Sequence, residues 1–246
     1  MADDKKVGIK SSDTRKSGRT SLHGNIPAKL TRPRLAKNYC RTRLIEMLDH
    51  AFVASAVWLG APPGTGKTSL AASWLEVRQR QCLWYQVDNG DADLATFFHY
   101  LGLAARHIAP RHKKALPALT SEYLQGLETF SRRFFEELFR RMPQHSVVVF
   151  DNFQQADGKL DNILQIAIES LPEHVKILCL SRTSPPPEFA RLQVNGQLTL
   201  LEPAAISLTL AEAEGLALLR GESDLAKVAA IHYRTHGWTA GQNTRG

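Results

Sequence analysis

The loop Ala61–Thr68, with the sequence A-P-P-G-T-G-K-T, constrains the fold of this chain more than any other segment. The apolar run Phe52–Leu59 before it predicts a buried strand, and residues Lys67–Arg80 after it predict a helix. Glycines in such a loop permit a tight turn that directs backbone N–H groups inward, and the helix N-terminus adds the positive end of its dipole. The segment therefore predicts a phosphate-binding loop between a strand and a helix.

Two side chains at the end of this loop have distinct expected roles. Lys67 can reach the terminal phosphates of a nucleotide, and the hydroxyl of Thr68 is suited to Mg²⁺. The usual pattern begins with Gly, whereas here Ala61 stands in that place and Gly60 lies one position earlier. The competing interpretation is a Gly-rich turn with a surface lysine. We expect the phosphate site to comprise Pro62, Pro63, Gly64, Thr65, Gly66, Lys67, Thr68 and Ser69.

The rest of the chain alternates predicted strands with predicted helices. The further strands are expected at Cys82–Val87, Ser146–Asp151, Val175–Leu180 and Gln197–Leu201, and the helices between them at Leu94–Ile108, Leu119–Arg141 and Leu160–Leu171. A continuous apolar run such as S-V-V-V-F-D is typical of a parallel strand that is buried on both faces. The alternation predicts an α/β fold in which a parallel sheet of five strands is flanked by helices.

Shorter segments lie on either side of this alternation. Residues Leu30–Leu35 surround a proline and predict an extended segment, and apolar residues at 44, 45 and 48 mark one face of a short helix. After the last strand, Thr209 and Glu212 form a capping-box signature before a helix, and a second helix is expected over Asp224–His236. We therefore expect a disordered tail over 1–27, a nucleotide-binding domain over 28–203 and a small helical lid over 204–246.

Polar residues follow two of the buried strands. Asp151 ends one strand, at the edge where open α/β sheets bind ligands, and can hold Mg²⁺; the alternative is a cap of the strand end. Asn152 follows it, where an acid would polarise the attacking water, and an amide is a poor base. Arg182, just after another strand, can sense the terminal phosphate or can pair with a loop carboxylate. The candidate catalytic residues are Asp151, Asn152 and Arg182, and the candidate metal ligands are Thr68 and Asp151.

The segment Asp88–Asp93 contains three aspartates with a spacing that is similar to part of a calcium loop. Its glycine is misplaced for such a loop, and no glutamate closes it. We interpret it as a turn followed by a helix cap.

The positive charge of the chain is concentrated near its N-terminus. The formal net charge is +7, and residues 1–43 contain 12 Lys and Arg against 3 Asp and Glu, so the remainder is slightly acidic. Such an arm is either a solvated leader or a weak binder of nucleic acid or anionic lipid. The N-terminus lacks the apolar core of a secretory signal, and no apolar stretch is long enough to span a membrane. Three widely separated cysteines fit a reducing cytosol, so we expect a cytoplasmic protein.

Seven segments, taken in order, resemble the nucleotide-binding module of the MalT-like, LuxR-type ATP-dependent transcriptional regulators, which are STAND-class ATPases. These segments are residues 29–35, 61–70, 83–93, 147–152, 180–186, 208–218 and 236–241. The resemblance implies that Lys67 and Thr68 bind ATP and Mg²⁺, that Asp151 is the Walker B acid and that Arg182 is the sensor. It further implies the strand order 5-1-4-3-2, a helical lid that begins within 204–241, and a position for 29–35 beside the base.

Three departures from that family qualify the expected function. Asn152 replaces the usual second acid, the segment after Gly241 reads Q-N-T-R-G, and the chain stops before the family's helical sensor repeats and its C-terminal helix-turn-helix. We expect a fragment, a truncated gene product or a stand-alone remnant that acts as an ATP-binding switch, hydrolyses ATP slowly and self-associates on ATP binding. DNA contact is expected only through the missing domain, or weakly through the tail. Alternatives are a nucleotide binder without turnover, a nucleic-acid binder that uses the tail, and a small-molecule kinase.

Overall fold

The computed structural model describes residues 26–35, 39–112, 114–235 and 237. At its centre is one sheet of five strands, in the order β2-β3-β4-β1-β5. Every neighbouring pair of strands is parallel, so both the predicted parallel sheet and the predicted strand order are confirmed. The strands are β1 (Ala56–Gly60), β2 (Cys82–Gln86), β3 (Ser146–Asp151), β4 (Val175–Ser181) and β5 (Leu198–Leu201).

The strand register brings the carboxyl ends of the strands to a common edge. Gly60 of β1 lies opposite Ser181 of β4, and Gln86 of β2 lies opposite Asp151 of β3. All residues of β1 and β3 are buried, which agrees with their continuous apolar sequences. The segments that follow β1, β3 and β4 therefore all leave the sheet at the edge where ligands bind in open α/β folds.

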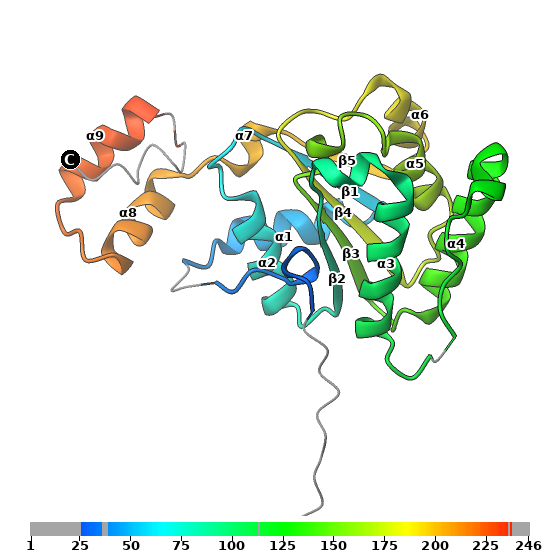
Figure 1. Ribbon diagram of the computed structural model, residues 1–246. Coiled ribbons are helices and arrows are strands. Elements are labelled where there is room, and N and C mark those ends of the chain that lie inside the picture. Colours follow the sequence, from blue (N-terminus) through cyan, green and yellow to red (C-terminus); the bar gives the residue numbers. More distant parts are fainter. Residues whose placement is uncertain (1–25, 36–38, 113, 236, 238–246) are drawn as a thin grey trace, which may run out of the picture.

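Helices connect the strands and continue beyond β5 (Figure 1). The α-helices are α1 (Thr42–Ala51), α2 (Lys67–Val77), α3 (Leu94–Ile108), α4 (Leu127–Arg141), α5 (Asp161–Glu169), α6 (Ala190–Val194), α7 (Pro203–Ile206), α8 (Leu210–Leu219) and α9 (Leu225–Thr235). Short 3₁₀ helices include η1 (Ala28–Leu30), η2 (Asn89–Ala92), η3 (Ser121–Gly126), η4 (Phe153–Ala156) and η5 (Pro187–Phe189).

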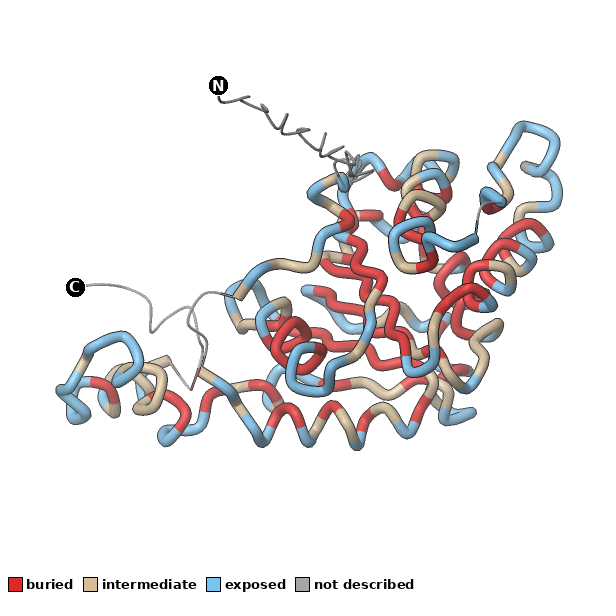
Figure 2. Tube along the Cα trace, turned by 90° about the horizontal axis from the view of Figure 1, so that it is seen from below, coloured by how far each residue is buried: buried red, intermediate tan, exposed pale blue. Residues whose placement is uncertain are grey.

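Two apolar cores lie on opposite faces of the sheet. Alternate residues of the strands point to each face: Val57 and Leu59 belong to the core that α1 and α2 cover, whereas Trp58, the residue between them, belongs to the core that includes α3, α4 and α5. The result is a three-layer arrangement, with α1 and α2 on one side of the sheet and α3, α4 and α5 on the other (Figure 1). Buried residues follow the strands and the inner faces of these helices (Figure 2).

Three predicted boundaries are wrong in detail. The strand expected from Phe52 begins only at Ala56, because α1 continues to Ala51 and the ring of Phe52 stacks on Trp74 at 4.8 Å between centroids. The helix expected from Leu119 begins at Leu127, after η3. A 3₁₀ helix also places side chains three residues apart on one face, so apolar spacing does not separate the two forms. Leu30 lies in η1 rather than in an extended segment.

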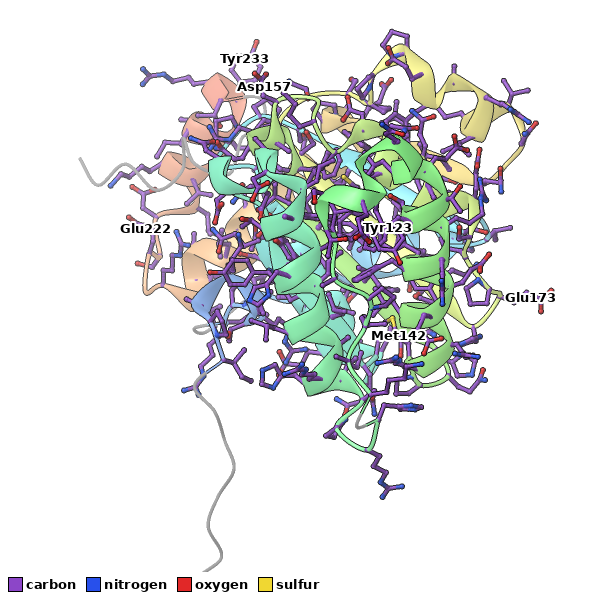
Figure 3. The ribbon with its side chains drawn as sticks, turned by 45° about the vertical axis from the view of Figure 1, so that its right-hand side comes forward. Tyr123, Met142, Asp157, Glu173, Glu222 and Tyr233 are labelled. Carbon is purple, nitrogen blue, oxygen red and sulfur yellow. The ribbon has the colours of Figure 1, made fainter. Side chains whose placement is uncertain are left out.

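The helices after β5 begin with the predicted capping box. The Thr209 hydroxyl accepts a hydrogen bond from the Glu212 N–H at 3.2 Å, and the Glu212 carboxylate accepts one from the Thr209 N–H at 3.0 Å. Helices α8 and α9 lie to one side of the sheet (Figure 1), and Tyr233 of α9 points outward with 84% of its surface exposed (Figure 3). A division of the chain at 203/204 stays a prediction.

Part of the sequence prediction falls outside the described residues. The tail predicted to be disordered, 1–27, lies almost entirely outside the described residues, which begin at residue 26. The predicted end of the last helix at 236 also lies outside them. Among the residues that the structure describes, no helix is both long and apolar enough to cross a membrane.

The end of β1 generates a stability prediction. A Cβ at Gly60 would lie 2.9 Å from the backbone oxygen of Thr183 in the loop after β4, which is too close without a backbone shift. We expect Gly60→Ala to lower the free energy of unfolding by about 1–3 kcal/mol, as overpacking does, when measured by urea denaturation. The control is Gly102→Ala in α3, where the added Cβ meets nothing within 4 Å. It should stabilise by about 0.5–1 kcal/mol, and equal effects of the two substitutions would contradict the prediction.

Candidate functional site

The loop between β1 and α2 has the conformation that its glycines predict. Gly64 has a φ of 76° and Gly66 a φ of 86°, values in the left-handed region where a side chain is unfavourable. The hydroxyl of Thr65 donates to the carbonyl of Pro62 at 2.9 Å and closes the turn. Helix α2 begins immediately after the loop, at Lys67. The loop therefore lies at the N-terminus of α2, where the positive end of the helix dipole favours an anion.

Lys67 is held at the centre of this loop. Its ammonium group donates to the carbonyl of Ala61 at 2.6 Å and to that of Pro62 at 2.9 Å, and the residue is only 9% exposed. Burial lowers the pKa of Lys67; the Asp151 carboxylate acts in the opposite direction and the Arg182 charge in the same one. The alternative of a surface lysine is therefore wrong, because this ammonium is buried inside the turn.

Thr68 and Asp151 meet although they are far apart in the sequence. The Thr68 hydroxyl donates to both carboxylate oxygens of Asp151, at 3.2 and 3.1 Å. Asp151 is 4% exposed, and burial raises its pKa, although hydrogen bonds from Thr68 and from the backbone of Asn152 act against this rise. A hydroxyl and a carboxylate in contact are the hard oxygen donors that Mg²⁺ takes when phosphate and water supply its other ligands.

This pair of residues suits a cation shared with a ligand rather than a site built from protein alone. In the described part of the chain, no group of three or more His, Cys, Asp or Glu side chains could hold a metal ion. Mg²⁺ is commonly held by one or two protein groups together with substrate phosphates. The donor set therefore fits the predicted metal ligands, with the phosphate-binding loop directly beside them.

Asn152 lies at a sharp turn after β3. Its backbone has φ 59° and ψ 39°, in the left-handed region that Asn tolerates better than most residues. Its carbonyl accepts a hydrogen bond from the N–H of Gln155 at 2.9 Å, and the residue is half-buried. Asn152 was a candidate because of its side chain, and its left-handed backbone is a second reason for asparagine at this position.

Arg182 follows β4, which lies between β1 and β3 in the sheet. The residue is exposed, and its charge is near enough to Lys67 to contribute to the lowered pKa of that lysine. The three catalytic candidates, Asp151, Asn152 and Arg182, are therefore at the same edge of the sheet as the loop.

Gln154, which was not predicted from the sequence, contacts the loop that carries Arg182. Its side-chain oxygen accepts a hydrogen bond from the backbone N–H of Arg182 at 3.0 Å. Its side-chain nitrogen is buried and has no hydrogen-bond partner among the described residues. A buried donor without a partner is costly. No sequence signal marked this glutamine, because its contact joins two loops that follow different strands.

The segment after β2 is a turn and a helix cap, as predicted. Asp88 caps η2, and Asp93 accepts hydrogen bonds at the start of α3. The fully buried carboxylate of Asp91 accepts hydrogen bonds from the Tyr85 hydroxyl at 2.6 Å and from Lys29 at 2.9 Å. Burial lowers the pKa of Lys29, but hydrogen bonds to Asp88 and Asp91 outweigh it and raise the pKa overall.

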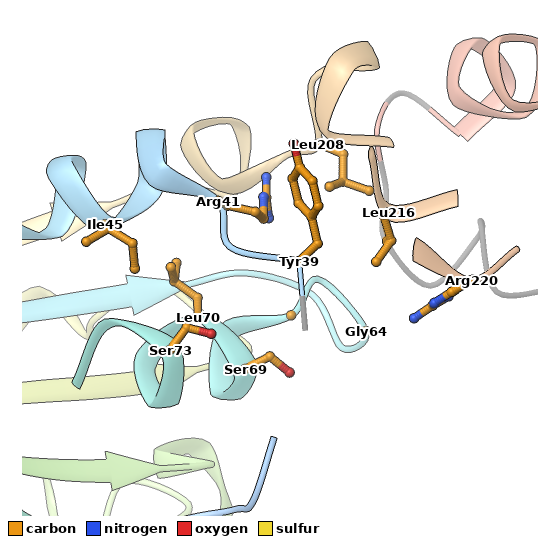
Figure 4. Close-up of a pocket in the computed structure, with 11 residues that line it drawn as sticks. Tyr39, Arg41, Ile45, Gly64, Ser69, Leu70, Ser73, Leu208, Leu216 and Arg220 are labelled. Atoms are coloured by element: carbon orange, nitrogen blue, oxygen red, sulfur yellow. The ribbon is translucent and has the colours of Figure 1, made fainter. Parts of the chain in front are cut away.

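A cavity of about 240 Å³ opens beside the phosphate-binding loop. Figure 4 shows Tyr39 and Arg41, which precede α1, between the loop and the residues around α8. The residues that line the cavity are Tyr39, Arg41, Ile45, Gly64, Gly66, Ser69, Leu70, Ser73, Leu208, Leu216 and Arg220.

Only part of this lining was predicted as a binding site from the sequence, namely Gly64, Gly66 and Ser69. The lining residues before α1 and around α8 were not predicted. The lining does not include residues 29–35, and Lys29 pairs with Asp88 and Asp91. The position of 29–35 beside the base, which the resemblance implies, stays a prediction. No local pattern could have identified Arg41 or Leu216, since the chain brings them together only on folding.

Comparison with known proteins shows the family to which the chain belongs. A family model described as Nephrocystin 3, N-terminal, matches residues 42–182, which include the phosphate-binding loop, Asp151 and Arg182. The chain is 27% identical over 224 residues to the HTH-type transcriptional regulator MalT of Vibrio cholerae, and the match covers 87% of this chain and 24% of that protein. It is 32% identical to the MalT of Vibrio campbellii over 177 residues, which are 69% of this chain and 19% of that protein.

The fold has a counterpart among solved structures. A Signal Transduction ATPase with Numerous Domains (STAND) protein with a tetratricopeptide repeat sensor, from Pyrococcus horikoshii, aligns with a TM-score of 0.54 at 19% identity. The alignment covers 87% of this chain and 30% of that one, so the likeness concerns the fold of one module. The P-loop fold expected from the sequence is confirmed. This chain belongs to the Nephrocystin 3, N-terminal, family, and it is a P-loop module similar to the corresponding part of the MalT regulators.

Proposed function

We propose that this chain is the ATP-binding switch module of a signal-responsive transcriptional regulator. The observation that carries the proposal is the meeting of Lys67, Thr68 and Asp151 at one end of a glycine loop that faces a helix N-terminus. A lysine, a hydroxyl and a carboxylate in this arrangement match the needs of a nucleotide's terminal phosphates and their Mg²⁺.

Each part of the site takes a part of the nucleotide. Backbone N–H groups of residues 64–69 and the Lys67 ammonium hold the phosphates, and Thr68 and Asp151 hold Mg²⁺, which neutralises charge on the phosphate oxygens. Pro62 and Pro63 have no N–H to donate, and they shape the turn instead. The cavity beside the loop takes the nucleoside. Its wall combines the ring of Tyr39 with aliphatic side chains such as Leu70 and Leu216, which suits a planar base.

The regulatory part of the proposal rests on the relatives. The similar curated proteins are HTH-type transcriptional regulators, and the solved structure is a signal-transduction ATPase. This chain spans about a quarter or less of the length of those regulators, so the signal, DNA binding and self-association are proposals for the whole protein. Closure of α7–α9 over ATP or ADP would be the signal. The three cysteines are free, which fits the cytoplasmic location that we propose.

Slow hydrolysis follows from the chemistry available after β3. Asp151 is committed to Thr68 and the cation, and the next side chain is the amide of Asn152, which cannot accept a proton near neutral pH. Arg182 would sense the terminal phosphate. A long-lived ATP state suits a switch better than an enzyme that turns over rapidly.

Removal of the loop lysine tests nucleotide binding. We expect Lys67→Ala to weaken ATP binding at least tenfold, which is about 1.4 kcal/mol, because the substitution removes the one side-chain charge that the loop directs at the phosphates. The measurement is calorimetric titration of ATP and ADP with and without Mg²⁺. Lys114→Ala, at an exposed lysine between α3 and α4, is the control and should bind like the wild type. An unchanged dissociation constant in Lys67→Ala would remove the phosphate-binding assignment.

Removal of the Asp151 charge tests the metal assignment. Asp151→Asn keeps the shape of the side chain and can still accept the hydrogen bond from Thr68. We expect the Mg²⁺-dependent gain in ATP affinity to disappear, while Mg²⁺-free binding and the melting temperature change little. Loss of both kinds of binding together would instead mean that Asp151 supports the fold of the strand end.

Restoration of an acid at position 152 tests the origin of slow turnover. Because Asp also tolerates the left-handed backbone found here, Asn152→Asp should preserve the turn, whereas Asn152→Glu would strain it. We expect the single-turnover rate of ATP hydrolysis to rise by roughly 10²-fold, the low end of general-base catalysis, with little change in ATP affinity. Asn195→Asp, at an exposed residue after α6, should change neither. Rapid hydrolysis by the wild type would contradict this account.

A further inference from the structure

Glu212 of α8 pairs with two arginines at the start of α1, Arg41 and Arg43. It is 7% exposed, and its carboxylate accepts hydrogen bonds from Arg41 at 2.8 and 3.1 Å and from Arg43 at 3.1 and 3.2 Å. Burial raises the pKa of Glu212, but the hydrogen bonds from Arg43 and Arg41 outweigh it and lower the pKa overall. Glu212 is therefore an ionised group, and it ties α8 to the residues around the start of α1.

The same two guanidinium groups hold the segment between α7 and α8. Arg41 donates to the carbonyls of Ile206 and Ser207 at 2.9 and 2.8 Å, and Arg43 donates to those of Ala205 and Ser207, both at 2.9 Å. This segment leads directly into Leu208 and α8. The carboxylate of Glu212 and the carbonyls of residues 205–207, bound by the two arginines, thus fix the position of α8 beside the cavity.

The ion pair between Arg41 and Glu212 joins two walls of the proposed nucleoside cavity. Arg41 is one of its lining residues, and Leu208 and Leu216 line it from the side of α8 (Figure 4). Tyr39, which also lines the cavity, approaches Gly215 so closely that a Cβ there would lie 2.3 Å from its ring. The contact between the two walls is consequently tight, and Glu212 is placed to hold both walls at once.

We infer that Glu212 is a positioning residue for the nucleoside half of the ligand, and this inference rests on the proposed function. Glu212 is not itself among the lining residues of the cavity. It acts through Arg41, whose guanidinium it orients, and through α8, whose apolar side chains it holds against the cavity. Recognition of the base and ribose therefore depends on a carboxylate that does not touch the nucleotide.

The charge of Glu212 is what this role requires. Two arginines share one carboxylate, so loss of that charge leaves two neighbouring cations without their counterion. Repulsion between the guanidinium groups would then turn Arg41 away from its present orientation. The phosphate-binding loop has its own hydrogen bonds within residues 61–67 and does not depend on Glu212.

The substitution Glu212→Gln separates these effects. A glutamine can keep the capping box, because it accepts a hydrogen bond from the Thr209 N–H as glutamate does, but it lacks the charge. We expect ATP to bind about tenfold more weakly while inorganic tripolyphosphate binds as to the wild type, since tripolyphosphate would occupy only the phosphate and Mg²⁺ part of the site and not the cavity beside it. Both are measured by calorimetry with Mg²⁺. Glu214→Gln on the same helix is the control, and both ligands should bind to it normally.

A double-mutant cycle distinguishes positioning from general support of the fold. If Glu212 acts through Arg41, Glu212→Gln should cause little further loss of ATP affinity in an Arg41→Gln background. Glu212→Asp keeps the charge on a shorter side chain and should lose less ATP affinity than Glu212→Gln. It also serves as the test variant if Glu212→Gln fails to melt cooperatively, because the contrast between ATP and tripolyphosphate still applies to it.

Each other outcome overturns a specific claim. Equal losses of ATP and tripolyphosphate affinity, additive effects with Arg41→Gln, or unchanged ATP binding in Glu212→Gln would overturn the role of Glu212 while leaving the proposed function intact. If the wild type binds neither ATP nor tripolyphosphate, the proposed function itself is overturned, and with it this inference.

Discussion

The parallel pairing of β1, β4 and β3 is the constraint on which the rest of the structure depends. Parallel strands end at the same edge, so the segments after Gly60, Asp151 and Ser181 emerge side by side. The loop after β1, the acid at the end of β3 and the arginine after β4 are thereby brought together without any local sequence relation. A sheet buried on both faces holds this edge rigidly, which is what a site made of loop residues requires.

Two opposite charges are buried at this edge, and their burial is costly. Lys67 and Asp151 have pKa values moved toward their neutral forms by burial. Each group is nevertheless satisfied, since Lys67 donates to two carbonyls of its own loop and Asp151 accepts from Thr68. Perturbed titratable groups at a cleft are typical of functional sites. In the proposed function, phosphates and Mg²⁺ would compensate the same charges more completely than the protein does alone.

Helix α8 and the residues that flank it contribute a wall of the cavity. Helix α8 reaches the cavity because Arg41 and Arg43 hold Glu212 and the carbonyls before it. In a switch, an element of this kind must be able to respond to the ligand. Helix α8 is joined to the residues before α1 by this ion-pair cluster and by the contact of Tyr39 with Gly215. Such a wall meets that requirement better than one embedded in the sheet.

The amino-acid sequence by itself determined the parts whose physics is local. Apolar runs identified the strands, the glycines identified the phosphate-binding loop, and Thr209 with Glu212 identified the start of α8. The strand order, by contrast, came from a resemblance. Local patterns were least reliable at Leu119–Arg141, where a 3₁₀ helix and an α-helix share the same apolar spacing.

Only the tertiary structure decided which residues meet. Three sets of hydrogen bonds join residues at least 28 positions apart: Thr68 with Asp151, Gln154 with Arg182, and Arg41 and Arg43 with Glu212. Glu212 illustrates the difference: its role in the capping box could be predicted, because that hydrogen bond spans three residues, whereas its two arginine partners could not. A sequence pattern reports the bonds that a residue makes with its neighbours along the chain, and the partners brought to it by folding depend on the packing of the whole sheet and its helices.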